Sequence, residues 1–480
     1  MVFIVKLTWF FLLIKALQYS LVYFSPSQFD TSTELLLKQL TNDTDHQLID
    51  TYWNSNFYNK LLSWDSVFFL KAIVHEKSPN DIIKFEHEYA FSNIWSKLIY
   101  VIDLYIHGPL SITGKDMDIN YVYRVIKVGL VVGNIIFYLS SILLYYLTIL
   151  TFSNHSTDLK SKKIAEKTAF LFIISSVSGF IISIYSEPLS FMFAFIGLIT
   201  RELSLNNRDT DKNGNTTELF DLKLYCWPLY VIATSLSFII AMWNRTNCIF
   251  LGIYFLFDVF QLLYSRKFYK MIFFPLLSGI LLFTAFIYKE YYVAYYQFCP
   301  ERGEWCTTSI IDKVPFLTKQ SFYNFIQTKY WNIGFLNYWT LNNIPNFLFA
   351  LPNIIILITA TIYFTKKYPT RHITPTIWIT RCFLLVLIFF AHVQIINRVF
   401  SFIPIHLWFI SDKLYRNEYL MFTKKTDVCH EKLEVERDGI KNMNRFTSDS
   451  DDKIIKFYLY WLLFWVPLQT IFFASFLPPA

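Results

Sequence analysis

Residues 126–152 read IKVGLVVGNIIFYLSSILLYYLTILTF, and this run indicates the class of fold. A membrane span needs about 20 mainly apolar residues, and Lys127 is the one charged residue in the run. The rest of the chain has the same character, because 54% of its 480 residues are hydrophobic, 20% are aromatic and only 16% are charged. A soluble protein of that length would carry about 25% charged residues. We therefore expect an all-α membrane protein that crosses the bilayer several times.

Apolar runs of this kind recur from one end of the chain to the other. The first is read as a retained signal anchor, because it lacks a clear small-residue cleavage site. The clear candidates for spans are 3–24, 126–152, 168–185, 224–243, 248–264, 271–291, 346–364, 373–395 and 454–476. Two shorter runs, each containing a proline, are 188–200 and 399–411.

Lysines and arginines predict the orientation, since short basic loops stay in the cytoplasm. Such loops follow the apolar runs at 160–167, 266–270, 366–371 and 413–425. They can all share one side only if both shorter runs cross, so we expect about eleven spans, a cytoplasmic N-terminus and a lumenal C-terminus. The formal net charge of +7 is then an orientation signal and does not indicate a nucleic-acid partner.

This orientation divides the rest of the chain, which reads as a single transmembrane domain over 1–480. Two large loops, 25–125 and 292–345, fall on the lumenal side. The tracts 201–222 and 412–453 are charged and poor in apolar residues, so we expect them to be solvated cytoplasmic linkers.

Two covalent modifications follow from the same orientation. Cys299 and Cys306 lie in a lumenal loop, where a disulfide is chemically allowed; two unpaired thiols are the alternative. Asn42-Asp43-Thr44 is a glycosylation sequon on the lumenal side. No cysteine or histidine spacing indicates a zinc site.

The stretch from Leu61 to Phe69 carries the first candidate for chemistry. Its apolar residues suggest an amphipathic helix on the membrane surface, which places Asp65 at the lipid–water boundary beside Trp64. A carboxylate there can act as a general base towards a sugar hydroxyl. The alternative is a solvated or helix-capping Asp.

Glu86, His87 and Glu88 form the second candidate. Three consecutive ionisable residues beside aromatic ones are costly near a bilayer unless they are paired. They could bind a polar head group or orient the base, and a solvated loop face is the alternative. A metal site is disfavoured, because neighbouring residues on a helix point in different directions.

Further polar residues mark the lumenal ends of spans. The arginines among them lie on the face opposite to the one that orientation signals favour, so they are better explained by an anion such as a lipid phosphate than by anchoring alone. A mixture of Trp331 with nearby asparagines suits sugar rings, although interfacial tryptophans also form membrane belts. The span-end residues are Glu187, Asn244, Arg245, Asn247, Asn397 and Arg398.

Taken in order, these motifs resemble the GPI mannosyltransferase 2 family, also called PIG-V, and its yeast members in particular. The resemblance rests on Ser63-Trp64-Asp65, Phe85–Phe91, Tyr185–Pro188, Asn244–Asn247 and Asn397-Arg398, together with the segment 299–306 and the ending 476–480. It covers residues 1–480 except the tracts 201–222 and 412–453.

The resemblance implies a GT-C glycosyltransferase of the endoplasmic reticulum that works with a small accessory membrane subunit. It implies transfer of the second mannose, α1,6-linked and with inversion, from dolichyl-phosphate mannose to the one-mannose GPI precursor on the lumenal leaflet. We assign Asp65 as the base, and Arg245 and Arg398 as phosphate ligands with Arg302 behind them. Because the donor is a monophosphate lipid, we expect no obligatory metal or other cofactor.

Three other functions stay open at this point. Another dolichyl-phosphate-sugar-dependent GT-C enzyme would share the motifs. A lipid transporter would place ionisable residues at mid-membrane, whereas most of them here lie at span ends. A non-catalytic subunit of a glycosylation pathway would keep the fold and tolerate loss of Asp65.

Overall fold

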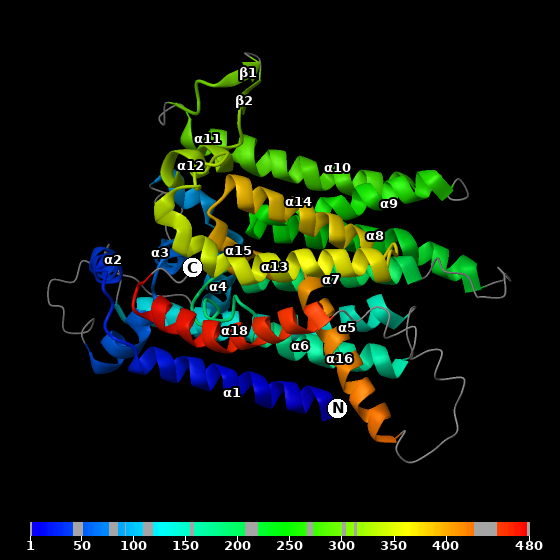
Figure 1. The fold of residues 1–480 in the computed structure, drawn as a ribbon. Helices are drawn as coiled ribbons and strands as arrows, with labels where there is room; N and C mark the ends of the chain where they lie inside the picture. The colour runs from blue at the N-terminus through cyan, green and yellow to red at the C-terminus, as the bar shows by residue number, and fades with distance from the viewer. Residues whose placement is uncertain are drawn as a thin grey trace.

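The computed structural model describes residues 2–41, 51–75, 85–91, 93–108, 119–153, 158–206, 219–265, 272–299, 304–311, 314–426 and 449–477. Long helices lie side by side in one bundle (Figure 1). They are α1 (Val2–Phe24), α5 (Ile119–Ser153), α6 (Asp158–Ile173), α7 (Glu187–Asn206), α8 (Leu219–Asn244), α9 (Gly252–Ser265), α10 (Phe273–Ile287), α13 (Ile344–Lys367), α14 (Thr374–Phe390), α16 (Ile405–Thr426) and α18 (Asp449–Ala474).

Shorter elements gather at one end of this bundle, near the C-terminus (Figure 1). They are α2 (Ser32–Thr41), α3 (Asp65–His75), the 3-10 helix Glu86–Ala90, α4 (Asn93–His107), α11 (Ala294–Phe298), α12 (Phe322–Trp331) and α15 (Ile396–Val399). Strands β1 (Ser309–Ile311) and β2 (Val314–Thr318) form an antiparallel hairpin there. The two large loops of the sequence thus meet, because the Tyr330 hydroxyl donates to Glu86 across them at 2.7 Å.

The class of an all-α polytopic membrane protein is confirmed. Within the described residues, seven helices are long and apolar enough to cross a membrane. Val393–Phe402 and Ile405–Leu420 form a further bent pair, with an angle of 74° at the break, where Pro404 cannot donate a backbone hydrogen bond. Pro228–Asn244 and Thr374–Phe390 are shorter apolar helices. The expected number of spans is therefore not confirmed.

One expected span has a different structure. We expected a helix over 168–185, but α6 ends at Ile173 and residues 174–186 form successive turns. Residues 175–186 are all buried. Non-helical backbone at membrane depth is tolerated only where protein covers it, and the surrounding helices supply that cover.

The charged tracts are also more ordered at their edges than expected. Helix α7 continues into the first tract as far as Asn206, and the buried Arg201 binds Asp258 with two hydrogen bonds of 3.0 and 2.7 Å. Helix α16 continues through the buried Asp412. The edges of the two tracts are therefore not solvated as we expected, because their charged residues are paired inside the bundle. Residues 207–218 and 427–448 lie outside the described part.

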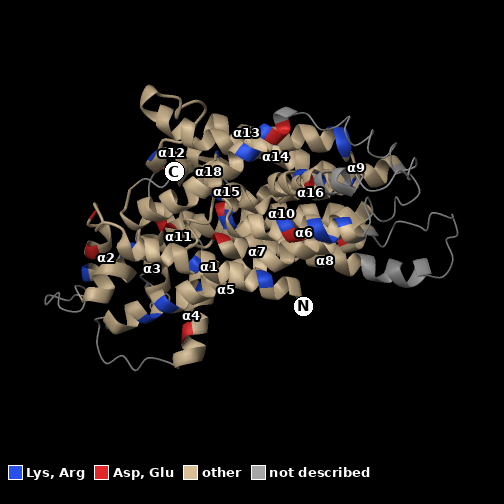
Figure 2. Cartoon of the chain, turned by 60° about the horizontal axis from the view of Figure 1, so that its bottom comes forward, with Lys and Arg blue, Asp and Glu red and all other residues tan. Residues whose placement is uncertain are grey.

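Blue and red segments meet beside α15 (Figure 2). At the end of the bundle that carries α12, Cys299 and Cys306 form the expected disulfide. Trp305, between them, is buried and packs against Phe322 of α12. Trp305 therefore packs the segment that carries Cys306 against the helix that follows the hairpin.

Candidate functional site

Four charged side chains meet at the end of the bundle that carries α3 and α15. Arg398 donates from Nη1 to Asp65 Oδ2 at 2.7 Å, and its Nε lies 3.3 Å from Glu187 Oε1. Arg245 donates from Nη2 to the same Glu187 oxygen at 2.6 Å. Glu187 therefore links the two arginines, and we call these four residues the charge cluster.

Helix ends place the two acids. Asp65 is the first residue of α3 and Glu187 is the first residue of α7, and the helix dipole favours a negative charge at such positions. Pro188 follows Glu187, where its fixed φ suits the first turn of a helix. The Asp65 backbone N–H donates to the Tyr185 hydroxyl at 3.2 Å, so the two helix starts are joined directly.

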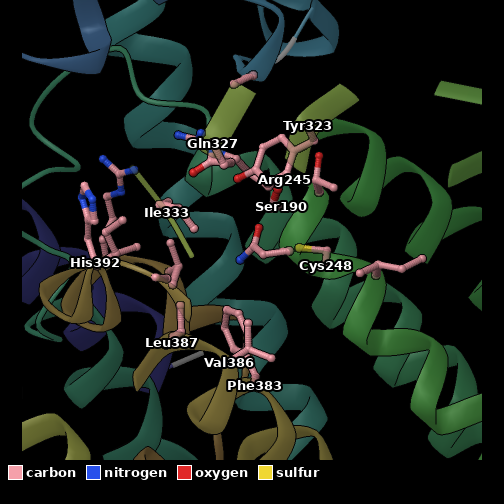
Figure 3. Close-up of a pocket in the computed structure, with 18 of the residues that line it drawn as sticks. Ser190, Arg245, Cys248, Tyr323, Gln327, Ile333, Phe383, Val386, Leu387 and His392 are labelled. Atoms are coloured by element: carbon pink, nitrogen blue, oxygen red, sulfur yellow. The ribbon is translucent and has the colours of Figure 1, made fainter. Parts of the chain in front are cut away.

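The charge cluster borders a cavity of about 510 Å³. One part of its wall is polar and includes all four residues of the cluster. Another part is apolar, and α14 supplies much of it, as the side chains of Phe383, Val386 and Leu387 show (Figure 3). The apolar lining residues include Ile249, Phe250, Phe286, Phe383, Val386, Leu387, Phe390, Val399 and Phe402. A cavity with this division suits a molecule that has a charged head and an apolar chain.

Some polar atoms of the cluster have no hydrogen-bond partner among the described residues. They are Glu187 Oε2 and Arg245 Nε, and both are buried. Buried polar atoms are nearly always paired in proteins. These atoms therefore provide hydrogen-bonding capacity beside the cavity that the protein itself does not use.

Trp64 is held beside Asp65 by the C-terminal end of the chain. Its φ is 57°, a left-handed conformation that is uncommon for a bulky residue. Its indole Nε1 donates to the Leu477 carbonyl at 3.0 Å, and its ring stacks on Phe476 at 5.5 Å. The strained backbone is thus stabilised by contacts that also direct the indole to the cavity wall.

Glu86 and Glu88 are buried rather than solvated, His87 is half-buried, and Ala90 and Phe91, which follow them, line the cavity. Glu86 accepts a hydrogen bond from Tyr330, and Glu88 forms an ion pair with Lys71. His87 stacks on the ring of Phe85 at 5.7 Å. Burial lowers the pKa of His87 below 6.5, and the positive charge of Lys71 acts in the same direction, whereas Glu88 opposes the shift.

The two predicted asparagines outside the cavity wall support backbone next to the charge cluster. Asn244 donates to the Ser186 carbonyl at 2.8 Å, one residue before Glu187. Asn397 accepts from Asn353 at 2.7 Å and immediately precedes Arg398. Both side chains are buried, so they lie behind the residues that line the cavity.

The remaining predicted residues divide into two groups. Asn247 and Trp331 line the cavity. Arg302 and the sequon residue Asn42 lie outside the described residues. In the part of the chain that the structure describes, no group of three or more His, Cys, Asp or Glu side chains could hold a metal ion, and the metal independence of the reaction stays a prediction.

The cavity wall also contains polar residues that sequence reasoning missed. His392 and Gln394 lie at the end of an apolar run, close to Arg398, and their polarity there was a usable signal. Tyr323 and Gln327 are one helical turn apart on α12, and no local pattern distinguished them from other loop residues. All four line the cavity.

A bundle of apolar helices with a half-charged, half-apolar cavity defines an integral membrane protein that handles an amphiphilic molecule. The chain belongs to the mannosyltransferase (PIG-V) family, whose family model matches residues 4–480. It is 46% identical over 479 residues to "GPI mannosyltransferase 2" of Saccharomyces cerevisiae, covering 99% of this chain and 100% of that one. The corresponding proteins of Candida glabrata and Kluyveromyces lactis are 41% and 40% identical, over 99% and 98% of this chain and 99% and 96% of theirs. The family resemblance of the motifs is confirmed, and the chain is a glycosyltransferase.

Proposed function

We propose that this mannosyltransferase adds the second, α1,6-linked mannose to a one-mannose GPI precursor, with dolichyl-phosphate mannose as donor. The names of its relatives support the GPI acceptor. The observation that carries the donor assignment is the shared cavity, in which Asp65, Arg245 and Arg398 border an apolar wall. A polyprenyl phosphate sugar has the matching halves, an anionic head and a long apolar chain.

The reaction assigns a role to each charge. The acceptor hydroxyl attacks C1 of the donor mannose, Asp65 takes the hydroxyl proton, and the bond from C1 to the phosphate oxygen breaks. The donor is β-linked and the product α-linked, so one displacement with inversion is sufficient. A general base of this kind contributes roughly 10²–10⁴-fold.

The arginines act on the leaving group. The donor phosphate is a diester with a charge of about −1, and it leaves as a monoester with a charge nearer −2. Arg245 and Arg398 therefore interact more strongly with the products of bond cleavage than with the donor, which is the requirement for electrostatic catalysis. Glu187 holds both guanidinium groups in place until the phosphate competes for them.

Aromatic residues on the cavity wall suit the sugar. Trp64 and Trp331 both line the cavity, and indole rings stack against the apolar faces of sugars while their edges hydrogen-bond. We assign these two residues to sugar binding. Asn244 and Asn397 support backbone beside the charge cluster, and Glu86, His87 and Glu88 immediately precede the segment that supplies Ala90 and Phe91 to the cavity wall.

The proposed setting is the endoplasmic reticulum membrane, with the N-terminus cytoplasmic, the site lumenal and a small accessory membrane subunit bound. The described chain places its N-terminal and C-terminal ends at opposite ends of the bundle (Figure 1), as this orientation requires. A glycosylation reporter near residue 215 is expected to stay unmodified, and Asn42 to be glycosylated. Glycosylation of a reporter near residue 215 would contradict the proposed orientation.

The central test is transfer by the purified protein. Labelled dolichyl-phosphate mannose is supplied with a one-mannose GPI precursor, and product linkage is read by α-mannosidases of known specificity. We expect α1,6-linked product from that acceptor and none from a precursor that already carries the second mannose. Transfer only to an acceptor outside the GPI series would overturn the proposal.

A further inference from the structure

The turn segment 174–186 forms a support for the charge cluster, although it lies where a membrane helix was expected. The Arg398 guanidinium lies over the rings of Phe180 and Tyr185, 5.5 Å from each centroid. The Ser176 hydroxyl donates to the carbonyl of Asn397 at 2.8 Å. Since Tyr185 also accepts from the Asp65 backbone N–H, the segment contacts both the proposed base and a proposed phosphate ligand.

This segment is held by polar side chains from α1 and α18. Lys15 donates to the Ile181 carbonyl at 2.9 Å, and Gln18 donates to the Ser178 carbonyl at 2.9 Å. On the α18 side, Gln469 accepts from the Gly179 backbone N–H at 3.0 Å. We call Lys15, Gln18 and Gln469 the polar clamp. They satisfy backbone groups that a continuous helix would have satisfied by itself.

Glycine 179 shows that the fit is close. A Cβ atom added at Gly179 would lie 2.5 Å from Gln469 Oε1 and 2.8 Å from the Cβ and Cγ of Gln469. A side chain at 179 would therefore require the Gln469 side chain, the segment or α18 to shift. Gly179 and Gln469 are 290 residues apart, so this contact is a tertiary feature.

Burying the Lys15 ammonium inside a membrane helix costs free energy, so we expect this lysine to have a function. An ionisable residue inside a membrane helix is expensive and marks function or a specific partner. Lys15 is buried in α1, and its ammonium meets a backbone carbonyl and the ring of Phe137 rather than a carboxylate. A methionine there would be easier to insert into the bilayer.

We propose that the polar clamp positions the charge cluster for mannose transfer, so that Lys15, Gln18 and Gln469 are positioning residues of the reaction. They do not touch the cavity. Their effect passes through the turn segment to Asp65 and Arg398. This inference rests on the proposed function, because it assigns Asp65 and Arg398 to the transfer step.

The test compares Lys15→Met with Lys6→Met, which makes the same change at an exposed position of the same helix. Both variants of the full-length protein are purified and assayed for kcat and for the KM of each substrate. Mannose released to water is counted beside mannose transferred. A shift of the base and the phosphate ligands by about 1 Å is expected to lower kcat by about 10–100-fold, with KM changed by less than about threefold and hydrolysis rising relative to transfer.

A second variant keeps the inference testable if Lys15→Met does not fold. Gln469→Met keeps the Cβ and Cγ that pack on Gly179 and replaces the amide, so the oxygen that accepts from Gly179 is lost. Gln261→Met on α9, which makes the same change, is its control. Gln469→Met should reproduce the fall in kcat, and Gln469→Glu, which restores an acceptor, should recover part of it.

The outcomes separate the inference from the function on which it rests. Normal kcat in folded Lys15→Met and Gln469→Met would overturn the clamp, and so would a loss explained entirely by the amount of folded protein. Absence of transfer by the unsubstituted protein and by Lys6→Met would instead overturn the proposed function.

Discussion

Asp65 and Arg398 are 333 residues apart in the sequence, yet the Asp65 carboxylate accepts a hydrogen bond from the Arg398 guanidinium at 2.7 Å. The proposed base and a proposed phosphate ligand are therefore in direct contact. In the proposed reaction, a donor phosphate that binds Arg398 would compete with this contact and free the carboxylate for the acceptor hydroxyl. The pair would then link donor binding to the availability of the base.

Asp65→Asn is expected to abolish turnover, with kcat reduced by about 10²–10⁴-fold. The side chain keeps its size and hydrogen-bonding capacity but loses the basic oxygen, so added donor should not restore activity. The measurement is mannose transfer by purified protein at rising donor concentration. Glu304→Gln removes an acid that is 77% exposed and should remain active. Near-normal transfer by folded Asp65→Asn would show that Asp65 is not the base, and Glu187 or Glu86 would become the next candidate.

Arg245→Lys should weaken activity in a way that added donor relieves in part. Lysine keeps the charge but loses the planar fork that binds both Glu187 and a phosphate. We expect the KM for the donor to rise about 10–100-fold, because one charged hydrogen bond is worth roughly 1.5–3 kcal/mol. Arg381→Lys on α14, whose partner is Thr365, is the matched control. A fall in kcat at unchanged KM would show that Arg245 acts only in the transition state.

His87 should contribute a dependence of stability on pH. Burial lowers its pKa below 6.5 in the folded protein, so the unfolded chain binds more protons as the pH falls through about 6.5. The contribution of neutral His87 to the free energy of unfolding is complete above that pH and is lost below it. We expect the thermal midpoint of His87→Phe, which retains an aromatic ring beside Phe85, to fall less between pH 7.5 and 5.5 than that of the unsubstituted protein. Parallel curves would show that His87 does not titrate in this range.

The disulfide should protect the loop that carries it. Cys299 and Cys306 are expected to resist alkylation until they are reduced, and opening the bridge should cost about 2 kcal/mol locally for a loop this short. Cys306→Ser should therefore increase proteolysis within 292–345, whereas Cys382→Ser should not. Equal cleavage of the two variants would show that packing of Trp305 alone holds the loop.

Phe476→Ala should reduce activity without unfolding the protein. It removes the ring that stacks on Trp64 at 5.5 Å, and an aromatic pair is worth about 1 kcal/mol, or roughly fivefold in kcat/KM. Phe457→Ala removes a ring that is 60% exposed on α18, the helix that precedes Phe476, and should be neutral. If both substitutions lowered activity equally, the effect would come from changes at the lipid-facing surface and not from the stacking on Trp64.

Sequence alone determined the class of this protein, because apolar runs such as 126–152 select a membrane environment by local composition. It also identified the disulfide and the family, since the first depends on a short loop and the second on short ordered motifs. Only the tertiary structure decided that residues 174–186 are not helical. The hydrogen bonds that replace the helix come from Lys15, Gln18 and Gln469, which are far away in the chain.

The same reason limited the prediction of the site. Sequence placed Glu187, Arg245 and Arg398 at span ends and Asp65 on a helix at the membrane surface, but the pairing of these distant segments leaves no local pattern. Helix packing brought these four together, put Asn244 and Asn397 behind them, and added residues such as Tyr323 and His392 that lay in unremarked positions. Local hydropathy therefore determines that a segment enters the membrane, whereas long-range packing determines which polar groups meet there.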